Sequence, residues 1–467
     1  MDGSRIRVIQ GSELDPSHPS WALGRSTRTA HSQQLKERKF HTRLRVPSSS
    51  PHLDMTTRDG VPPASDPWVT ELTRISVDND TFKVATLSPN NAFIATVVQV
   101  TDICVYDVAT SQLLHTFRGH TGHIAHLEFH PGGRKLVSSS SPSGLEREGQ
   151  VRMWDLDAPD QCLDDLEATA ETATAAAAPI LLRRWAKEDL ESAELQKKIS
   201  ELLFAAQIAV DVRNGRAFLG EFAPFDARAF SCDGRSLLYL PDRKTVAVLD
   251  VGTFTERFRL SGHTDGIMWA ETSPNDTLVA TSSWDRTVRI WSMESGESIR
   301  VLEGATGQSW SGAFSPDGEL VAAGSGDQMV RIWRVDTGEL LHTLSGFRGW
   351  VRTLSFSPDG IRLAAGASKG ALRIFNVESG ECEQSWQVDF GNNRSAPSFI
   401  ELRSVQYTSR GDLFFCSTEG RIFGYRASDN LKWEFFESQV YGSLEASIDG
   451  TKLTAALRGN VVVWNIE

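Results

Sequence analysis

Histidine is concentrated in one short stretch of the chain, at His115, His120, His123, His126 and His130. Imidazole is a common ligand of zinc, which needs three or four ligands at about 2.1 Å from one ion. The residues from 123 to 130 favour a β-strand, whose ends would lie about 23 Å apart at a rise of about 3.3 Å per residue. Since one ion cannot collect side chains over that distance, we predict no metal site and no cofactor.

Sequence motifs that would indicate catalysis do not occur either. There is no P-loop, no GxSxG, no HExxH and no dinucleotide-binding fingerprint. The glycine-rich stretches AAGSGD at 322–327 and AAGASKG at 364–370 fit strands that run into turns. We therefore predict no catalytic residue and no enzymatic activity.

Composition limits the partners further. The 467 residues include 48 basic and 60 acidic side chains, a formal charge of −12. This balance argues against nucleic acid, because binding along a phosphate backbone relies on clustered Lys and Arg. No run approaches the roughly 20 apolar residues that cross a bilayer, and the N-terminus lacks the apolar core of a secretory signal. With five cysteines that show no CxxC spacing, we expect an intracellular protein, cytoplasmic, nuclear or both, that binds no membrane.

A short turn motif recurs along the chain, and one residue in each copy serves as an anchor for alignment. The eight anchors are Ser88, His130, Ser231, Ser273, Ser315, Ser357, Thr408 and Ser447, separated by 42, 101, 42, 42, 42, 51 and 39 residues. Each repeat contains four short apolar runs between Asp, Gly, Asn and Ser turns, which is typical of an antiparallel meander. Because one such sheet cannot bury both faces, the period predicts blades stacked around an axis.

The repeats resemble those of the WD40-repeat family, over roughly residues 68–467 apart from one insertion. The resemblance rests on Gly119-His120, Gly262-His263, the SPDG turns at 315–318 and 357–360, VRMWD at 151–155, TVRIW at 287–291 and VRIW at 330–333. It implies an all-β, WD40-like β-propeller. We name the four strands of a blade a to d, from the axis outward.

For the fourth repeat, the resemblance implies a structural tetrad of His263, Thr281, Asp285 and Trp291. The carboxylate would fix the imidazole, which bonds the hydroxyl, which accepts from the indole. A catalytic relay of the same groups is the alternative. We disfavour it, because a hydroxyl engaged by an indole inside a blade leaves no room for a substrate.

Other repeats depart from the tetrad, and we expect apolar packing to hold those blades together. The fifth lacks the His and the hydroxyl, the sixth lacks the His, the Asp and the Trp, and the eighth lacks the Asp. At these positions the fifth repeat has Ala305 and Ala323, the sixth has Phe347, Lys369 and Phe375, and the eighth has Arg458.

The eighth repeat contains only three strands before Glu467. A run at 71–75 lies at the right distance before Ser88 to be a strand d. We predict that this N-terminal strand completes the last blade, because an open ring would leave unpaired strand edges. The propeller then covers residues 68–467 and has eight blades, with seven as the alternative if the third or eighth repeat is absorbed elsewhere.

The spacing of 101 residues places an insertion within the second blade, at 157–213. Ala, Leu, Glu and Lys dominate this segment, so we predict two helices, at about 161–177 and 180–206. With 12 acidic and 6 basic residues over 157–215, the segment is strongly acidic. We expect it to leave the blade between strands c and d.

Residues 1–67 show little apolar periodicity and are rich in Ser, Pro, His and Arg, which predicts a disordered tail. Met1 and Met55 are both possible starts of the protein, and the sequence does not decide between them.

Large aromatic and basic residues gather in the connections of blades four to six. They are Trp284, Trp310, Phe347, Arg348 and Trp350. We expect them on the top face, defined as the end of the propeller that carries the b-to-c turns and the connections between blades. Because Trp and Arg dominate the energetics of interfaces, we predict a non-catalytic scaffold, monomeric within a complex, that binds proteins through the top face and the helical insert.

Two other functions are weighed against the scaffold. A substrate receptor of a ubiquitin ligase is disfavoured, because Trp154 is followed by Asp155, Leu156 and Asp157 and not by a W-D-x-R element. An enzyme or ligand binder using the central channel would need inward-facing carboxylates or histidines. Residues such as Ala125 and Leu354 predict an apolar lining instead.

Overall fold

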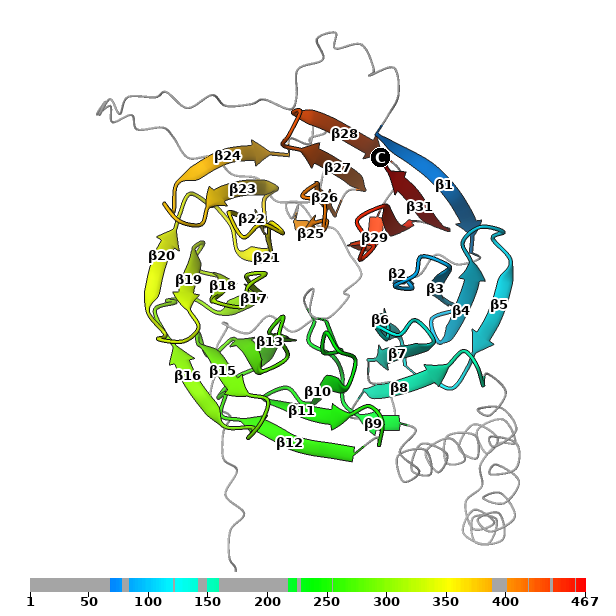
Figure 1. Cartoon of the computed structure of the whole chain (residues 1–467), viewed down its shortest axis with the longest axis horizontal. Helices are drawn as coiled ribbons and strands as arrows, with labels where there is room; N and C mark the ends of the chain where they lie inside the picture. The colour runs from blue at the N-terminus through cyan, green and yellow to red at the C-terminus, as the bar shows by residue number, and fades with distance from the viewer. Residues whose placement is uncertain are drawn as a thin grey trace, which may run out of the picture. The chain divides into compact units, whose positions relative to one another are not determined.

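A computed structural model describes residues 68–77, 84–120, 122–141, 149–158, 217–224, 228–253, 255–388, 401–418, 420–436, 440–457 and 459–467. Within these ranges every regular element is a strand, and the strands form eight sheets around a common axis (Figure 1). The all-β, eight-bladed prediction is confirmed. The predicted tail at 1–67 and the predicted helices of the insertion lie outside the described residues. No helix in the described ranges is long and apolar enough to span a membrane.

The strands follow one another as meanders, blade after blade. Blade one consists of β2 (Ala85–Leu87), β3 (Phe93–Val98), β4 (Asp102–Asp107) and β5 (Leu113–Phe117), and blade two of β6 (Ile124–Phe129), β7 (Lys135–Ser140), β8 (Gln150–Asp155) and β9 (Ala217–Leu219). Blade three consists of β10 (Ser236–Asp242), β11 (Thr245–Asp250) and β12 (Thr255–Ser261), and blade four of β13 (Ile267–Thr272), β14 (Leu278–Ser283), β15 (Val288–Ser292) and β16 (Ser298–Leu302). Blade five consists of β17 (Ser309–Phe314), β18 (Leu320–Ser325), β19 (Val330–Arg334) and β20 (Leu340–Leu344), and blade six of β21 (Val351–Phe356), β22 (Arg362–Ala367), β23 (Ala371–Asn376) and β24 (Cys382–Gln387). Blade seven consists of β25 (Leu402–Tyr407), β26 (Leu413–Ser417), β27 (Arg421–Arg426) and β28 (Leu431–Phe436), and blade eight of β29 (Val440–Ala446), β30 (Lys452–Leu457), β31 (Asn460–Ile466) and β1 (Val69–Ser76).

The anchor residues form the tight turns between strands a and b. In blade five the Ser315 hydroxyl donates to Asp317 and accepts from the Leu320 backbone N–H, while Gly318 adopts a φ of 74°. A positive φ favours glycine, yet blade four has Asp276 at this position, with a φ of 55°. Its carboxylate accepts two backbone N–H groups of the preceding blade, at 2.8 Å each. Where the glycine is replaced, the new side chain therefore links neighbouring turns.

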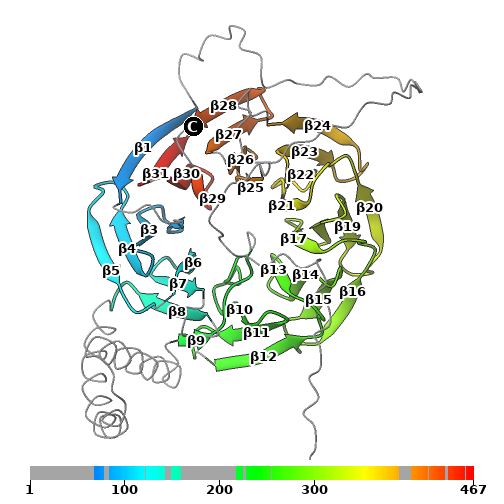
Figure 2. The same cartoon turned by 180° about the vertical axis from the view of Figure 1, so that it is seen from behind.

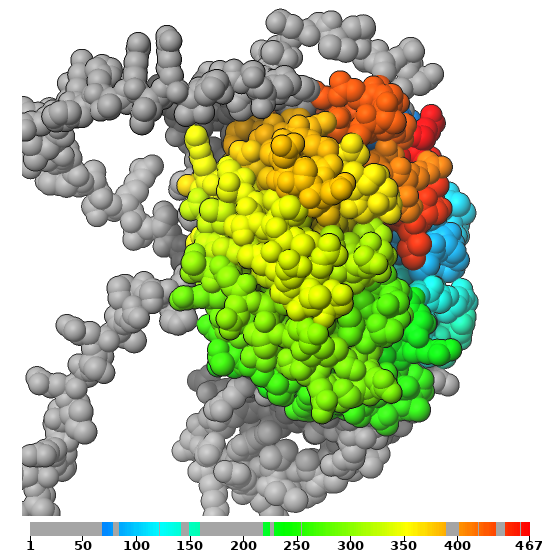
Figure 3. All heavy atoms as spheres, turned by 60° about the vertical axis from the view of Figure 1, so that its left-hand side comes forward, coloured from blue at the N-terminus to red at the C-terminus, as the bar shows by residue number. Residues whose placement is uncertain are grey.

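The hydrophobic core lies between adjacent blades. Trp269 of β13, for example, is 1% exposed and packs across to Phe314 of β17, in a cluster that also contains Ile290, Val321 and Trp333. Similar clusters join the other pairs, so that successive blades pack side by side around the ring (Figure 3). The top-face connections are thereby held on a rigid frame.

Gly312 of β17 provides the space that Trp269 occupies, since a Cβ at residue 312 would overlap the indole ring. We expect Gly312→Val to destabilise the propeller by about 1–3 kcal/mol, the usual cost of overpacking a core. Urea unfolding measures the change. Gly252→Val is the matched control, because Gly252 is exposed and a Cβ there meets its nearest atom only at 3.4 Å. Equal stability of the two variants would contradict this account of the contact between blades four and five.

Blade two has its third and fourth strands far apart in sequence. β8 ends at Asp155 and pairs with β9, which begins at Ala217. The chain between them thus departs from the c-to-d connection, at the end of the blade opposite to the top face.

Blade three differs from the others in its innermost strand. Its sheet contains only β10, β11 and β12, and two isolated bridges, Glu221 to Leu240 and Phe230 to Leu237, stand in place of strand a. The interruption lies on the side of the sheet that faces the axis.

The ring closes through β1, which pairs antiparallel with β31 in a register from Val69 opposite Ile466 to Ser76 opposite Asn460. Two more backbone hydrogen bonds extend the seam: the Glu467 N–H donates to Trp68 at 2.9 Å, and the Val77 N–H donates to Gly459 at 2.8 Å. The first described strand therefore lies beside the last (Figure 2). The run at 71–75 falls inside β1.

Candidate functional site

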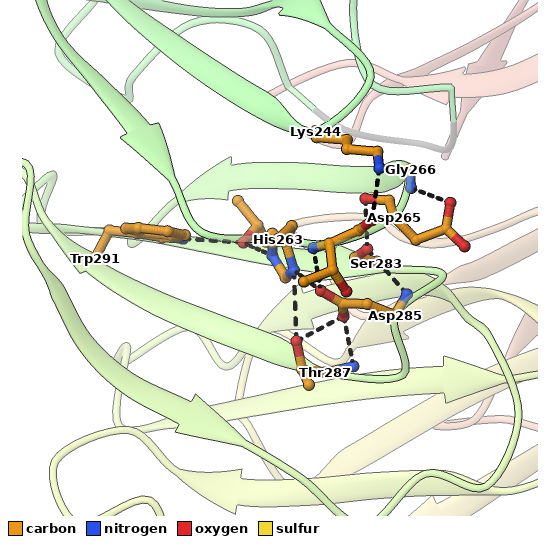
Figure 4. A network of polar contacts seen from close by, with 10 residues as sticks. Lys244, His263, Asp265, Gly266, Ser283, Asp285, Thr287 and Trp291 are labelled. Atoms are coloured by element: carbon orange, nitrogen blue, oxygen red, sulfur yellow. Dashed lines mark hydrogen bonds and ion pairs between the residues drawn. The ribbon is translucent and has the colours of Figure 1, made fainter.

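Blade four contains a continuous polar chain that runs from its core to its top face. The indole Nε1 of Trp291 donates to the Thr281 hydroxyl at 2.9 Å, and this hydroxyl lies 2.7 Å from Nε2 of His263. On the other side of the ring, Nδ1 lies 2.7 Å from the Asp285 carboxylate. The structure thus brings all four residues of the implied tetrad together (Figure 4).

The protons in this chain can be assigned from its partners. A carboxylate only accepts, so Nδ1 of His263 donates to Asp285, and the tautomer with its proton on Nδ1 leaves Nε2 as an acceptor. In this tautomer the Thr281 hydroxyl accepts a hydrogen bond from the Trp291 indole and donates one to Nε2. Burial by itself raises the pKa of Asp285, but hydrogen bonds from His263 and Thr287 outweigh it and hold the pKa well below its usual range. Because Thr281 is fully buried and uses its proton inside the blade, this arrangement acts as a structural brace.

The brace also fixes the neighbouring top-face loops. The Asp285 carboxylate accepts the backbone N–H of Thr264 at 3.0 Å, and the Ser283 hydroxyl donates to the carbonyl of Asp265 at 3.0 Å. Lys244, from blade three, donates to the Thr264 carbonyl at 2.7 Å. The connection that enters blade four is thereby tied to two b-to-c turns (Figure 4).

Blade two contains part of the same arrangement. The Ser138 hydroxyl lies 2.6 Å from Nε2 of His120 and accepts from the Trp154 indole at 2.8 Å. Burial and then the positive charge of Arg152 hold the pKa of His120 well below its usual range. His120 is therefore a neutral core residue.

Blade five, expected to be held mainly by apolar packing, also contains a buried ion pair. Because Ala305 and Ala323 stand in place of the histidine and the hydroxyl, Asp327 has no imidazole partner. Its carboxylate pairs with Arg331 at 2.8 Å, and both side chains are less than 10% exposed. Asp327 also accepts the Thr306 backbone N–H at 2.8 Å. An arginine from strand c thus replaces the missing imidazole.

Blade six does follow that expectation. Phe347 packs on Phe375 with ring centroids 6.0 Å apart, and Arg373 covers Phe347 at 5.7 Å while donating to the Gly346 carbonyl at 2.9 Å. In blade eight, Arg458 lies outside the described residues.

The Asp327 pair predicts a specific loss of stability in acid. Burial raises the pKa of Asp327, but hydrogen bonds from Arg331 and Ser325 outweigh it and lower the pKa from its ordinary 3.8 to about 2. A lowered pKa stabilises the folded state above pH 3.8, and this contribution disappears as the pH falls toward 2. We expect Asp327→Asn to be less stable than wild type at neutral pH and the difference to shrink over that window. Urea unfolding at several pH values measures it, and a difference independent of pH would contradict the assignment.

Three of the predicted partner-binding residues form an aromatic ladder across blades four to six. Trp284 meets Trp310 edge to face, with centroids 5.3 Å apart, and Trp310 stacks on Trp350 at 5.4 Å and an angle of 11°. The guanidinium of Arg352 lies 4.6 Å from the Trp310 ring and 5.6 Å from the Trp350 ring. We call these four residues the tryptophan ladder.

Exposure differs along the ladder and its flanking residues. Trp310 is only 5% exposed and Trp284 is half-buried, whereas Trp350 is 38% exposed. Arg348 is exposed on the same connection. Phe347 is 6% exposed and belongs to the core, so its selection as a partner-binding residue is wrong: the glycine-flanked connection turns this ring inward to fill the missing histidine position.

The inner strands contain polar side chains that the sequence reasoning missed. Two residues before the anchors stand Glu128, Glu271, Ser355, Gln406 and Glu445. Three of these side chains accept a backbone N–H from the innermost segment of the next blade: Glu128 from Ala229 at 2.7 Å, Ser355 from Tyr407 at 2.9 Å and Gln406 from Ala446 at 2.9 Å. They satisfy N–H groups that an edge strand leaves unpaired. The inner strands thus carry polar as well as apolar residues: Leu354 is buried in the core between blades five and six, whereas Ala125 is exposed.

Arg228, in the segment of blade three that takes the place of strand a, is an exposed residue whose charge interacts with acids of other blades. Burial lowers the pKa of Arg228, but the carboxylates of Glu271 and Glu128 outweigh it and raise it. Burial raises the pKa of Glu445 to about 8, against a hydrogen bond from Thr86 at 3.0 Å. The Glu128 and Glu445 carboxylates thus serve contacts between blades.

The histidine-rich stretch is distributed over separate contacts. His126 lies 3.3 Å from Glu128, and His130 bonds the Gly234 carbonyl at 2.9 Å. In the described part of the chain, no group of three or more His, Cys, Asp or Glu side chains is placed to hold a metal ion.

Known families match the chain in three places. The family described as WD domain, G-beta repeat matches residues 111–155 and 254–292, and the WD40 domain of anaphase-promoting complex subunit 4 matches residues 312–401. The first two matches begin near or at strand d of one blade and end in strand c of the next. The sequence repeat is therefore offset from the blade by one strand, as the closure by β1 requires.

Curated relatives match only in part. The zebrafish (Danio rerio) apoptotic protease-activating factor 1 is 24% identical over 220 residues, which are 46% of this chain and 16% of that protein. Eukaryotic translation initiation factor 3 subunit I from Neosartorya fischeri is 44% identical over 43 residues, 9% of this chain and 13% of that protein. The chain thus spans less than a fifth of these relatives. The repeat sequences, the eight four-stranded units and the family matches together identify the chain as a WD40-repeat β-propeller.

Proposed function

We propose that this protein is a non-catalytic scaffold that binds a partner protein through the top face of blades four to six. The observation that carries the proposal is the tryptophan ladder, whose buried members hold the exposed Trp350 in place. Trp and Arg are the residues that most often dominate interface energetics. A side chain that is already fixed loses little conformational entropy when a partner binds.

The rigidity of the surrounding loops supports the same function. The Asp285 and Asp327 networks fix the connections into blades four and five through backbone N–H groups. Two of the relatives are named as a factor that activates a protease and as a subunit of a translation initiation factor. The acidic segment at 157–213 is a second proposed surface, which rests on its sequence alone.

Affinity purification from native cells tests the scaffold. The intact chain is compared with Trp284→Ala/Trp350→Ala, with a deletion of residues 160–208, and with Ile448→Ala, a control at a residue that is 62% exposed on the opposite face. We expect the double variant to lose a reproducible set of partners while its melting temperature shows that it folds. Retention of every partner by the folded double variant would refute the top-face surface, and loss by the deletion alone would assign binding to the insert.

A further inference from the structure

The corner of the top face at blade six combines one exposed indole with two exposed cations. Trp350 and Ser368 are joined by two hydrogen bonds: the Ser368 N–H donates to the Trp350 carbonyl at 2.9 Å, and the Trp350 N–H donates to the Ser368 hydroxyl at 2.8 Å. Lys369 follows directly, and Arg348 precedes Trp350 by two residues. Both are exposed, and neither side chain bonds or ion-pairs with any residue that the structure describes.

The ladder already contains its own cation. Arg352 lies over Trp310 and Trp350, is 8% exposed and pairs with Glu401 at 2.5 Å. A cationic group of a partner would have to displace this guanidinium and break its ion pair. The π-face that would attract a partner's Lys or Arg is therefore occupied, and what remains for a partner is the exposed part of Trp350 and the two free cations.

Two of the described acids in the neighbouring connections are engaged in ion pairs. Glu401 pairs with Arg352, and Asp327 pairs with Arg331. Two further described acids, Asp265 and Glu303, lie in the segments that enter blades four and five, and Arg286 on the blade-four turn adds a third exposed cation. Among the described residues of the top-face connections of blade six, the charged side chains are thus those of Arg348 and Lys369, on a chain whose formal charge is −12.

We propose that the blade-six corner binds an acidic linear segment of the partner protein, with an apolar side chain on Trp350 and carboxylates on Arg348 and Lys369. This rests on the proposed function and adds the chemistry of the partner to it. Opposite charges across an interface raise the association rate and exclude wrong partners, and the indole gives an apolar anchor its binding energy.

The test selects a phage-displayed library of random twelve-residue peptides on the full chain and on Arg348→Glu/Lys369→Glu. We expect peptides from the wild type to be enriched in Asp and Glu around one large apolar residue, and the reversed variant to lose that enrichment. The synthetic consensus peptide, measured by fluorescence anisotropy, should bind the variant at least about tenfold more weakly and should weaken as salt screens the charges. Arg235→Glu, whose exposed charge lies on an a-to-b turn, is the matched control and should bind as wild type.

A neutral or basic consensus, an unchanged consensus on the reversed variant, or no enrichment at all would each overturn the acidic-segment proposal. Binding of a single-stranded oligonucleotide that the consensus peptide displaces would also overturn it, since the corner would then recognise phosphate. The native partners recovered by affinity purification distinguish the acidic-segment proposal from the scaffold proposal. If Trp350→Ala loses them and Arg348→Glu/Lys369→Glu keeps them, the scaffold stands and the acidic segment fails; if both variants keep them, both fail.

Discussion

Thr281→Val is expected to destabilise the propeller by about 2–4 kcal/mol. Valine matches threonine in shape, so no cavity opens, but the Trp291 indole N–H and Nε2 of His263 both lose their partner inside the blade. Each buried polar group left unpaired costs about 1–3 kcal/mol. Urea unfolding monitored by tryptophan fluorescence measures the loss.

Thr343→Val serves as the control for this substitution, because Thr343 is an exposed residue of β20 and tolerates the same change in shape. We expect it to stay within about 0.5 kcal/mol of the wild type, as surface substitutions usually do. A Thr281→Val protein as stable as this control would show that the hydroxyl does not brace blade four.

Removal of β1 is expected to abolish cooperative folding. A chain that begins at residue 78 lacks Trp68, Val69, Ile75 and Val77, all at most 6% exposed in the intact ring. Burial of each such side chain is worth about 1.5–3 kcal/mol, and the four together approach the roughly 5–15 kcal/mol by which a domain is stable. The loss also leaves β31 as an unpaired edge that promotes aggregation.

Circular dichroism melting and size-exclusion chromatography measure this effect. A chain that begins at residue 66 keeps β1 and is the matched control, for which we expect a single cooperative transition and a monomeric peak. If the chain that begins at residue 78 melts with the same midpoint as this control, the N-terminal strand does not close the ring.

The blades could be predicted from sequence because each one repeats the same local signals. Each turn is specified locally, by an anchor such as Ser315, an aspartate two residues later and a glycine with positive φ. The regular spacing of the anchors specifies the stacking of the blades. Closure by β1 follows from counting strands. These features depend on residues close in sequence.

Features that depend on contacts between repeats were harder to predict. Arg331 replaces a missing imidazole from strand c, where the family pattern assigns only the tryptophan to the tetrad. Glu128 and Glu445 reach the neighbouring blade, so their role depends on register, which a single strand does not reveal. Phe347 was misplaced because an aromatic residue in a connection looks the same whether it points outward or fills a vacant core position.

The ladder lies between these two cases. Trp284, Trp310 and Trp350 could be selected by residue type and by the connections they occupy. The stacking of these three rings depends on how far strand a of one blade is offset from strand a of the next blade. The packing of Arg352 against the rings depends on the same offset. Sequence therefore indicates the face, and the structure indicates which of its atoms a partner can reach.

Site-specific photo-cross-linking in cells tests the binding surface most directly. The photoreactive residue p-benzoylphenylalanine replaces either Ser345, exposed in the connection that leads to Trp350, or Ile448, 62% exposed on the opposite face of blade eight. The scaffold proposal predicts a discrete cross-linked partner from position 345 and none from position 448. Cross-linking of the same partner from position 448 alone, or equally from both positions, would contradict binding through the top face of blades four to six.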